Sequence, residues 1–346
     1  MADRPGRRLR VMQLLADPNR SARPVENPYT SLLVSSLPDE RIETRYFGWA
    51  DVLTSDADVV HMHWPENSLR HPRTAVRLLK RALFLLFILR LRMGRIAVVR
   101  TVHNARPHEE GDRGERWILG LLEARTTLWV TLNDVTPTPD PRRTVVIPHG
   151  HYRDRFASPT PEPRRGNLVH FGMLKPYKGV DELISAFAAV PHELDYRLHI
   201  VGESHDGPLT ERVRAASRRD ERMDIDLRFV DETELADAVG AAEIVVLPYR
   251  AIENSGSALL ALSLHRPVIL PESPSTRLLE EEFGDEWVGL YRGPLTAETL
   301  QRAVEDLRDR PRDAAGPDMS ERDWPRLGSL LADAYDRAAA SLRRRA

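Results

Sequence analysis

Short apolar runs of strand length recur along this chain, and they limit its fold more than any other feature. They are rich in Val, Ile and Leu and lack the polar alternation of a half-exposed strand, so they predict buried parallel strands. Segments of helical length separate them, which is typical of repeated β/α units. The runs form two series, at residues 8–15, 57–64, 95–104, 126–132 and 144–150, and at 167–172, 196–202, 225–230, 242–248 and 266–271.

The stretch between the two series is rich in proline and arginine and has no periodicity. Such a composition is typical of a linker between domains. We therefore predict an N-terminal Rossmann-like domain over residues 1–152, a linker over 153–166 and a second Rossmann-like domain over 167–320. A chain of 346 residues is long enough for two domains that each bury a core.

The composition excludes several classes of protein. Cysteine is absent, which rules out disulfides, thiolate zinc sites and a cysteine nucleophile. No apolar run approaches the roughly 20 residues of a membrane-spanning helix, and the first residues lack the apolar stretch of a signal peptide. We therefore expect a cytoplasmic protein.

Basic residues are concentrated in one part of the chain. Residues 1–150 carry 23 Lys and Arg against 17 Asp and Glu, whereas the remainder carries 27 against 35. No acidic residue occurs from Asn67 to His108. Binding of nucleic acid is one interpretation of such a segment.

The centre of this basic segment favours a different partner. Ala82–Leu89 is entirely apolar and has basic residues on both sides, a pattern typical of a helix on an anionic lipid surface. We therefore expect a membrane contact through residues 73–95 and no nucleic acid. The alternative is a helix buried against its neighbours with its arginines solvated. On the membrane interpretation, polar replacements of Leu85, Phe87 and Ile88 abolish binding to liposomes.

The clearest local motif lies at residues 170–190. A strand ends at Gly172, a loop carries Lys175 and Lys178, and apolar residues then recur at helical spacing from Val180 to Phe187. A lysine at the start of a helix opposes the helix dipole, unless an anion such as phosphate lies between them. The motif therefore predicts a phosphate-binding loop, with a solvated lysine loop as the alternative.

A second motif opens the helix that follows the run at 242–248. Asn254 or Ser255 can cap this helix, and Gly256 allows a ligand to approach the backbone, with Ser257 beside it. Alone this is an ordinary capped helix. Together with the lysine loop it predicts a site for a diphosphate.

Histidines follow several strands of the first series. His61 and His63 end one strand, His103 ends another, and His149 follows a third. They are candidates for a general base or for polar contacts with a hydroxylated ligand. A zinc site is the alternative interpretation. A nicotinamide or flavin cofactor is not expected, because the loop after the first strand lacks the glycine-rich fingerprint.

These segments together resemble the GT-B-fold glycosyltransferases of the retaining group 1 type. GMLKPYKGVDELISAF is similar to the diphosphate loop of that family, and NSGSALLALSLHRPVIL to its glutamate-containing loop, helix and strand. VVRTVHN resembles the strand that ends in an active-site histidine, and VVIPHGH the turn before the linker. The segment with Trp324, Leu327 and Tyr335 resembles the last helices, which implies a terminal helix over residues 321–346. The order of these motifs holds over about 330 residues.

The resemblance implies roles for particular residues. His103 and Glu253 are implied to be catalytic, and Asn27, Tyr29 and the other named histidines are expected on the acceptor side. The sequence also departs from the family. Met173 replaces an arginine, for which Lys175 can substitute, and Leu260 or Ala261 stands where the second glutamate is expected. The residues implied to bind the donor are Gly172, Lys175, Lys178, Asn254, Ser255, Gly256 and Ser257.

The fold implied is α/β, with two Rossmann-like domains facing each other across a cleft and a C-terminal helix crossing back to the first. The function implied is transfer of a hexosyl unit from a GDP- or UDP-sugar to a hydroxyl acceptor, with retention and without a metal or other cofactor. We expect a lipid-linked or glycoconjugate acceptor and a peripheral position at the inner face of the membrane. The alternatives are a nucleotide-sugar epimerase, a histidine-based metal hydrolase and a non-catalytic sugar-nucleotide-binding module.

Overall fold

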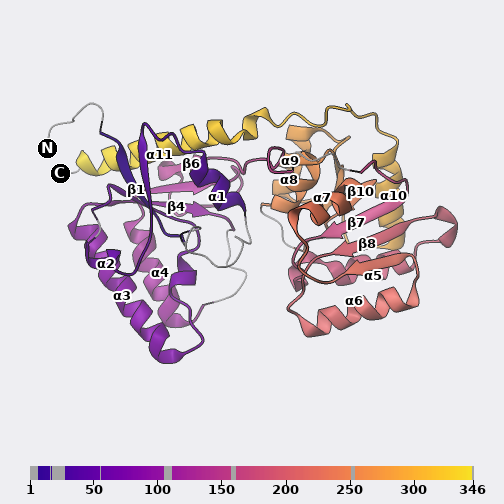
Figure 1. The fold of residues 1–346 in the computed structure, drawn as a ribbon, viewed down its shortest axis with the longest axis horizontal. Helices are drawn as coiled ribbons and strands as arrows, with labels where there is room; N and C mark the ends of the chain where they lie inside the picture. The colour runs from indigo at the N-terminus through magenta and orange to yellow at the C-terminus, as the bar shows by residue number, and fades with distance from the viewer. Residues whose placement is uncertain are drawn as a thin grey trace. The chain divides into compact units, whose positions relative to one another are not determined.

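The computed structural model describes residues 7–15, 17, 28–54, 56–104, 111–156, 161–250 and 254–344. The chain forms two compact units (Figure 1). Unit 1 comprises Met1–Gly150 and Arg322–Ala346, and unit 2 comprises His151–Glu321. Each unit contains a six-stranded sheet whose paired strands are parallel. The predicted α/β class with two Rossmann-like domains is therefore confirmed.

The sheet of unit 1 has the strand order β2-β1-β3-β4-β5-β6. The order reverses between β1 and β3, so ligands are expected beyond the carboxyl ends of these strands. The strands are β1 (Leu9–Gln13), β2 (Ile42–Tyr46), β3 (Val59–Met62), β4 (Ala97–Val102), β5 (Leu128–Thr131) and β6 (Thr144–Val146).

Helices cover both faces of this sheet. One core joins the sheet to α1 and α11, and another joins it to α3 and α4. The Asp112 side chain caps the first turn of α4 by accepting a hydrogen bond from the N–H of Glu115. The helices of unit 1 are α1 (Pro28–Ser35), α2 (Asp51–Thr54), α3 (Thr74–Met93), α4 (Arg113–Arg125) and α11 (Trp324–Arg343), with short 3-10 turns η2 (Pro65–Ser68) and η3 (Pro141–Arg143).

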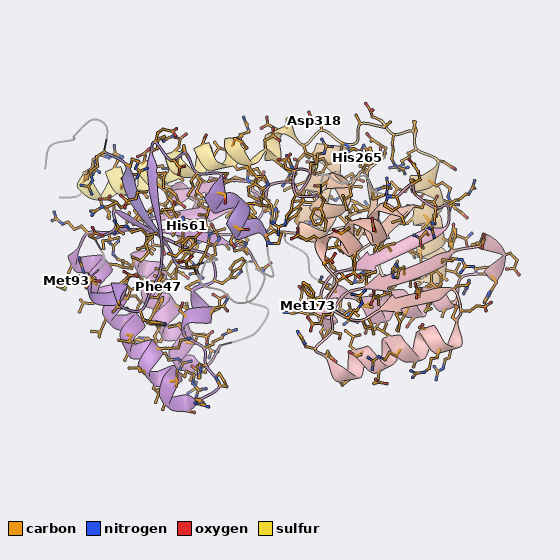
Figure 2. All side chains as sticks on the ribbon, viewed as in Figure 1. Phe47, His61, Met93, Met173, His265 and Asp318 are labelled. Carbon is orange, nitrogen blue, oxygen red and sulfur yellow. The ribbon has the colours of Figure 1, made fainter. Side chains whose placement is uncertain are left out.

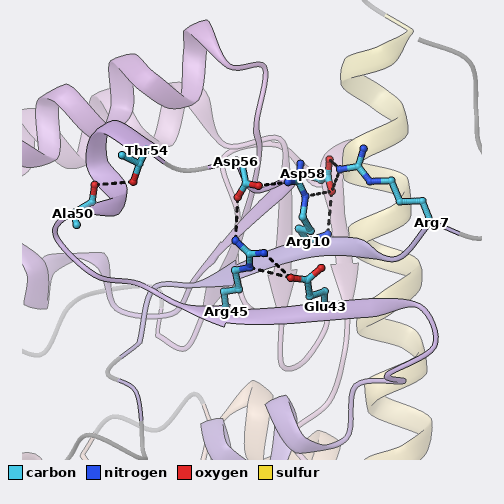
Figure 3. Close-up of polar contacts among 8 residues, drawn as sticks. All are labelled: Arg7, Arg10, Glu43, Arg45, Ala50, Thr54, Asp56 and Asp58. Carbon is cyan, nitrogen blue, oxygen red and sulfur yellow. Dashed lines mark hydrogen bonds and ion pairs between the residues drawn. The ribbon is translucent and has the colours of Figure 1, made fainter.

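Strand β2 was not predicted from the sequence, because its side chains are mostly polar. Arg45 of β2 bonds Glu43 at 2.7 Å and Asp56 at 3.2 Å. Arg10 of β1 in turn bonds Asp56 and pairs with Asp58 (Figure 3). Exposed ion pairs of this kind contribute only about 0–1 kcal/mol each. They allow a charged strand to lie at the edge of the sheet without an apolar pattern.

The sheet of unit 2 has the order β12-β11-β10-β7-β8-β9. Numbered within the unit and read from its other edge, this is the 3-2-1-4-5-6 order of the Rossmann fold, with the reversal between β7 and β10. The strands are β7 (Asn167–Phe171), β8 (Arg197–Val201), β9 (Met223–Asp226), β10 (Ile244–Val246), β11 (Val268–Pro271) and β12 (Val288–Tyr291).

The main core of unit 2 lies between the sheet and a layer that includes α5, α6 and α10. The apolar residues predicted to line the helix from Val180 to Phe187 are all buried, which confirms that helix. The helices are α5 (Val180–Ala188), α6 (Gly207–Arg219), α7 (Glu232–Gly240), α8 (Gly256–Ser263), α9 (Pro274–Phe283) and α10 (Ala297–Arg308), with 3-10 turns η4 (Pro176–Lys178), η5 (His192–Leu194) and η6 (Ser320–Arg322).

Two strands of this sheet differ from the sequence prediction. The run at 225–230 was predicted as a strand, but β9 spans Met223–Asp226, and the residues after it lead to the capped helix α7. Strand β12 was not predicted, because its four residues include Gly289 and form too short an apolar run. Both strands lie at edges of the sheet, where burial imposes the weakest pattern.

The last helix of the chain belongs to unit 1. Leu327, Leu331 and Tyr335 of α11 are buried in the same core as strands β1, β3 and β4. Gly328 lies so close to α1 that a Cβ atom there would overlap the backbone oxygen of Ser36. The chain therefore leaves unit 1 after Gly150 and returns to complete it.

Candidate active site

The loops after β7 and β10 lie side by side in unit 2, because these strands are neighbours at the point where the strand order reverses. The first loop runs from Gly172 to Gly179, and the second leads from Pro248 to helix α8. Residues predicted to bind the donor occupy both loops. We call Gly172, Lys178 and Ser255–Ser257 the lysine site.

Lys178 is the central residue of the lysine site. Its side chain is only 8% exposed, and no carboxylate among the described residues forms an ion pair with it. Its Nζ lies 5.5 Å from the ring centre of Tyr249 and 2.9 Å from where a Cβ atom on Gly172 would stand. Burial lowers the pKa of Lys178 from its ordinary value, an effect that Tyr177 partly offsets. A buried ammonium without a counter-ion favours binding of an anion.

Backbone geometry holds Lys178 in place. Gly172 and Gly179 both have positive φ, at 97° and 68°. A Cβ atom on Gly172 would crowd the amine of Lys178, and one on Gly179 would overlap the backbone oxygen of Pro248. Glycine is therefore required at both positions.

Arg250 connects the two loops, and the sequence did not identify it. Its guanidinium bonds Glu182 and Asp181 of α5 at 2.7 Å each, and the carbonyl oxygen of Pro176 at 2.9 Å. Its backbone N–H also donates to the carbonyl of Tyr177. The loop that carries Lys178 is thus bonded to the loop after β10.

The amino end of α8 completes the lysine site. The Ser255 hydroxyl accepts a hydrogen bond from the N–H of Ala258 at 3.0 Å, which is the cap expected from the sequence. The buried Tyr249 hydrogen-bonds Ser255 and Ser257, and burial raises its pKa. The first-turn amides of a helix and its dipole favour an anion at this end.

The other donor-side predictions have different positions. Lys175 is exposed, and Asn254 is half-buried just before α8. Glu253 lies outside the described residues. Leu260 and Ala261 are buried and apolar, so neither position offers a carboxylate for a ribose.

His170 is a further buried group near Lys178 that the sequence analysis did not select. Its Nδ1 lies 2.9 Å from the carbonyl oxygen of Val246, so Nδ1 carries the proton. Burial, followed by the charge of Lys178, lowers its pKa to about 3. His170 is therefore neutral, which avoids a second positive charge beside Lys178.

In unit 1, four of the predicted side chains meet beyond the carboxyl ends of the strands. His63 follows β3 and His103 follows the neighbouring β4, and His63 Nδ1 lies 3.1 Å from His103 Nε2. The ring of Tyr29 lies 5.4 Å from that of His103 and 4.4 Å from that of His149, centre to centre. We call Tyr29, His63, His103 and His149 the histidine edge. Asn27 lies outside the described residues.

Two tryptophans that the sequence analysis did not assign to a site flank the histidine edge. Trp64 stacks on His103 with ring centres 4.1 Å apart, and Trp324 of α11 lies 6.0 Å from Tyr29. Trp64 and His103 are half-buried, whereas Tyr29 and His63 are only 2% and 3% exposed. His103 and the flanking Trp64 are therefore more accessible to a ligand than Tyr29 and His63 are.

The histidine edge is neutral near pH 7. Burial lowers the pKa of His63 to about 3 and that of His149 to about 4. Burial also lowers the pKa of His103 well below its ordinary value, and His63 and His149 add to this effect. Neutral imidazoles can accept a hydrogen bond or a proton from a hydroxyl group.

His61 was expected on the acceptor side, but it lies in the interior among the strands of the first sheet (Figure 2). It is 0% exposed. Its Nδ1 lies 2.7 Å from the hydroxyl of Tyr335, and its Nε2 lies 2.8 Å from that of Thr101. Because both ring nitrogens of His61 are hydrogen-bonded inside unit 1, this residue has a structural position next to His63 and is not available to an acceptor. Tyr335 comes from α11, so this contact had no local signal in the sequence.

The zinc alternative rested on the same histidines. Among the described residues, no group of three or more His, Cys, Asp or Glu side chains is arranged to hold a metal ion. His63 and His103 instead bond each other.

Known proteins match most of the chain. Residues 165–309 match the family described as Glycosyl transferases group 1. A GDP-mannose:glycolipid 4-beta-D-mannosyltransferase of Xanthomonas campestris pv. campestris is 41% identical over 305 residues, which cover 88% of this chain and 86% of the relative. The chain belongs to the group 1 glycosyltransferases.

Several solved structures have folds similar to that of the chain. Anabaena Alr3699/HepE in complex with UDP-glucose has a TM-score of 0.61 at 14% identity, over 97% of this chain and 98% of that one. WaaG, a glycosyltransferase involved in lipopolysaccharide biosynthesis, has a TM-score of 0.57 at 15% identity, over 96% and 99% of the two chains. At these identities the likeness shows the fold, which is GT-B. The chain is thus a group 1 glycosyltransferase with the GT-B fold.

Proposed function

We propose that this enzyme transfers mannose from GDP-mannose to a hydroxyl group of a glycolipid. The observation that carries the proposal is the buried Lys178, which has no ion-pair partner among the described residues and lies between a glycine-rich turn and the amino end of α8. This arrangement suits the diphosphate of a nucleotide sugar. The choice of GDP-mannose and of a glycolipid follows the donor and acceptor for which the Xanthomonas relative is named.

The main chemical contribution of unit 2 is stabilisation of the leaving group. As the bond between sugar and diphosphate breaks, negative charge grows on the diphosphate oxygens. Lys178 and the first amides of α8 are already positioned for that charge, so little reorganisation is needed. Lys175, exposed in the same loop, can approach the diphosphate from solvent. We propose that this set of groups acts without a metal.

On the acceptor side, we propose that His103 receives the proton of the acceptor hydroxyl. Burial keeps its imidazole neutral, and His63 holds one of its ring nitrogens through the 3.1 Å contact. The stacked Trp64 offers an apolar face for a sugar ring. Replacing His103 with Gln is expected to lower kcat by about 100- to 10,000-fold, the usual contribution of a general base.

The stereochemical course of the reaction is a separate proposal. The resemblance implies retention, whereas the relative is named for a β-linked product. An α-linked nucleotide mannose gives a β-mannoside only by inversion at the anomeric carbon, and inversion needs a base on the acceptor side. The neutral His103 supports that course, so we propose inversion. The one-bond C1–H1 coupling constant of the product, measured by NMR, distinguishes a β-mannoside from the α-mannoside that retention requires.

The donor is tested by thermal unfolding with GDP, UDP, ADP and dTDP, each with and without EDTA. A ligand at 100 times its Kd adds about 2.7 kcal/mol to the free energy of unfolding. We expect stabilisation by GDP that EDTA does not change. Radiolabel from GDP-mannose should then enter a lipid-extractable product only when a glycolipid is present. Stabilisation by another nucleotide but not by GDP contradicts the proposed donor.

A peripheral membrane position also belongs to this proposal, and α3 is the element that supports it. Within the described ranges, no helix combines the length and apolar character needed to cross a bilayer. One face of α3 is buried through Phe84, Phe87 and Leu91. The other face exposes apolar residues at alternating spacings of three and four: Leu79, Ala82, Leu86, Leu89 and Met93.

The charges on α3 favour an anionic bilayer over a second copy of the helix. The helix contains Arg77, Lys80, Arg81, Arg90 and Arg92 and no acidic residue. A second copy would therefore place like charges along the apolar seam, which is destabilising. An anionic lipid surface attracts the same charges while it covers the seam.

The structure changes the choice of residues for the liposome test. Phe87 is 0% exposed, and Leu85 and Ile88 pack partly against the core, so their replacement would damage the fold. Leu86 and Leu89 are 46% and 51% exposed. We expect Leu86→Gln/Leu89→Gln to abolish binding to vesicles of phosphatidylcholine with phosphatidylglycerol.

A matched control is available within unit 1. Val135 and Leu330 are 43% and 37% exposed and lie outside α3. Val135→Gln/Leu330→Gln removes a similar amount of exposed apolar surface and should leave vesicle binding unchanged. Equal binding by the two double variants contradicts a role for α3.

A further inference from the structure

A cavity of about 200 Å³ lies in unit 1 at the amino ends of β5 and β6. Its wall is formed by the end of α4, the first residue of β5 and the last turns of α11. It is therefore at the opposite edge of the sheet from the histidine edge, and the proposed reaction does not use it. We call it the arginine pocket, after the four arginines in its wall: Arg125, Arg143, Arg337 and Arg344.

The positive charge of the arginine pocket is only partly neutralised. None of the described residues that line it is acidic. Arg143 bonds Asp140 outside the lining at 2.7 Å, and this is the one ion pair that the described structure gives to the four arginines. Burial lowers the pKa of Arg125, and the nearby Arg92 adds to this effect. In the part of the chain that the structure describes, three guanidinium groups around one cavity thus have no ion-pair partner, which favours an anion within it.

The hydrogen bonds of these arginines leave donors available. Arg125 uses Nη2 on the carbonyls of Leu91 and Ile96, at 3.1 Å and 2.7 Å. Its Nε is buried and has no hydrogen-bond partner among the described residues. Arg143 uses Nε and Nη1, the latter on the carbonyl of Thr126. These contacts do not use all five N–H groups of either guanidinium.

We propose that the arginine pocket binds a phosphate group. Guanidinium groups match phosphate oxygens in paired hydrogen bonds, and several arginines around one anion give a selective site. The cavity is smaller than the roughly 300–1,000 Å³ of sites for drug-sized ligands. It therefore suits a phosphate with a small substituent and does not suit a whole nucleotide sugar.

Such a phosphate has two sources, a soluble phosphate compound and the headgroup of an anionic phospholipid. The position of the arginine pocket favours the second source, because the pocket lies beside the carboxyl end of the proposed membrane helix α3. Arg125 bonds Leu91 and Ile96, the residues on either side of the carboxyl end of α3. Met93 at that end is 71% exposed, and Figure 2 shows it at the outer edge of unit 1.

The test uses the two arginines of the pocket that are exposed on α11 and beyond its end. Arg337 bonds the carbonyl of Arg142, and both Arg337 and Arg344 are exposed, so the fold does not depend on them. The pocket variant is Arg337→Gln/Arg344→Gln. The control, Arg214→Gln/Arg302→Gln, removes the same charge from exposed helices of unit 2. Thermal unfolding checks that both double variants are folded. If the pocket variant has a lower Tm than wild type, Arg344→Gln alone is used in its place.

Two measurements distinguish the sources. The first is calorimetric titration with inorganic phosphate at constant ionic strength. The second is co-sedimentation with phosphatidylcholine vesicles that contain or lack phosphatidylglycerol. Weakening of phosphate binding by about tenfold in the pocket variant, but not in the control, supports a soluble ligand. Loss of binding to phosphatidylglycerol vesicles in the pocket variant alone supports a lipid headgroup.

Equal phosphate affinity and equal vesicle binding in the pocket variant and the control overturn the proposal. GDP binding is measured in parallel and should be unchanged in both variants, because the pocket arginines belong to unit 1 and the control arginines form exposed ion pairs outside the lysine site. Failure of the arginine pocket is thus separable from failure of the proposed donor site.

Discussion

Replacing Lys178 with Met removes one charge from the lysine site and little else. Methionine fills most of the same volume, and the ammonium has no ion-pair partner to orphan among the described residues. The substitution loses the contact with Tyr249, where Nζ lies 5.5 Å from the ring centre, worth about 0.5–2 kcal/mol. It also removes the desolvation cost of a buried ammonium, which is of similar or larger size. We therefore expect the Tm of the unliganded protein to be unchanged or higher.

Binding of GDP should change in the opposite direction. A hydrogen bond to a charged group contributes about 1.5–3 kcal/mol, so its loss raises the Kd by about 10- to 150-fold. At a GDP concentration 100 times the wild-type Kd, wild type gains about 2.7 kcal/mol. A variant with 30-fold weaker binding gains only about 0.9 kcal/mol at the same concentration.

The assay is thermal unfolding with and without GDP, followed by calorimetric titration to measure the Kd. Arg302→Gln is the control, because it removes one positive charge from an exposed position on α10 of the same unit. Its Kd for GDP should equal that of wild type. Binding of GDP by Lys178→Met as tight as that of the control would contradict a role for Lys178 at the diphosphate. A much lower Tm of the unliganded variant would contradict the absence of a structural role.

Three further outcomes follow from the contacts. Arg250→Gln should raise the Kd for GDP in titrations, because it frees the loop that carries Lys178 without removing Lys178 itself. Gly328→Ala should lower the Tm, because the new Cβ overlaps the α1 backbone, whereas Gly120→Ala, with open space around it, should raise stability by up to about 1 kcal/mol. The pKa values of the histidine edge are lowered, to about 3 for His63 and about 4 for His149, so the unfolded chain binds more protons between about pH 4 and 6.5. The free energy of unfolding of the protein, followed by tryptophan fluorescence, should therefore be at its full value above about pH 6.5. As the pH drops through this window, it should fall by about 1.4 kcal/mol per pH unit for each of these histidines.

The sequence predicted best where a pattern is local. The helix after Gly172 carries its apolar residues at helical spacing, and all of them are buried as predicted. His63 and His103 each follow a strand, and because β3 and β4 are neighbours their rings meet. Strand β2 escaped prediction because ion pairs replace an apolar pattern along it.

Contacts between distant segments could not be predicted from the sequence. The sequence around Arg250 does not indicate its 2.7 Å bond to Glu182, because only the fold brings the two residues together. The interior position of His61 depends on Tyr335, which follows it by 274 residues. Which side of the apolar segment at 82–89 faces the core depends on the packing of α3 against α4 and the sheet, so the residues for the liposome test had to be chosen from the structure.

The path of the chain has a consequence for biosynthesis. Unit 2 is a continuous segment from His151 to Glu321, whereas unit 1 requires residues from both ends of the sequence. A ribosome therefore delivers all of unit 2 before it delivers α11, and unit 2 can fold while unit 1 still lacks one wall of its core. Until α11 arrives, the sheet face that Leu327, Leu331 and Tyr335 will cover is exposed. Unit 1 is thus the first to be started and the last to be completed. Premature termination before α11 leaves a nascent chain in which unit 1 exposes apolar surface, and such surface makes it a substrate for chaperones and proteases.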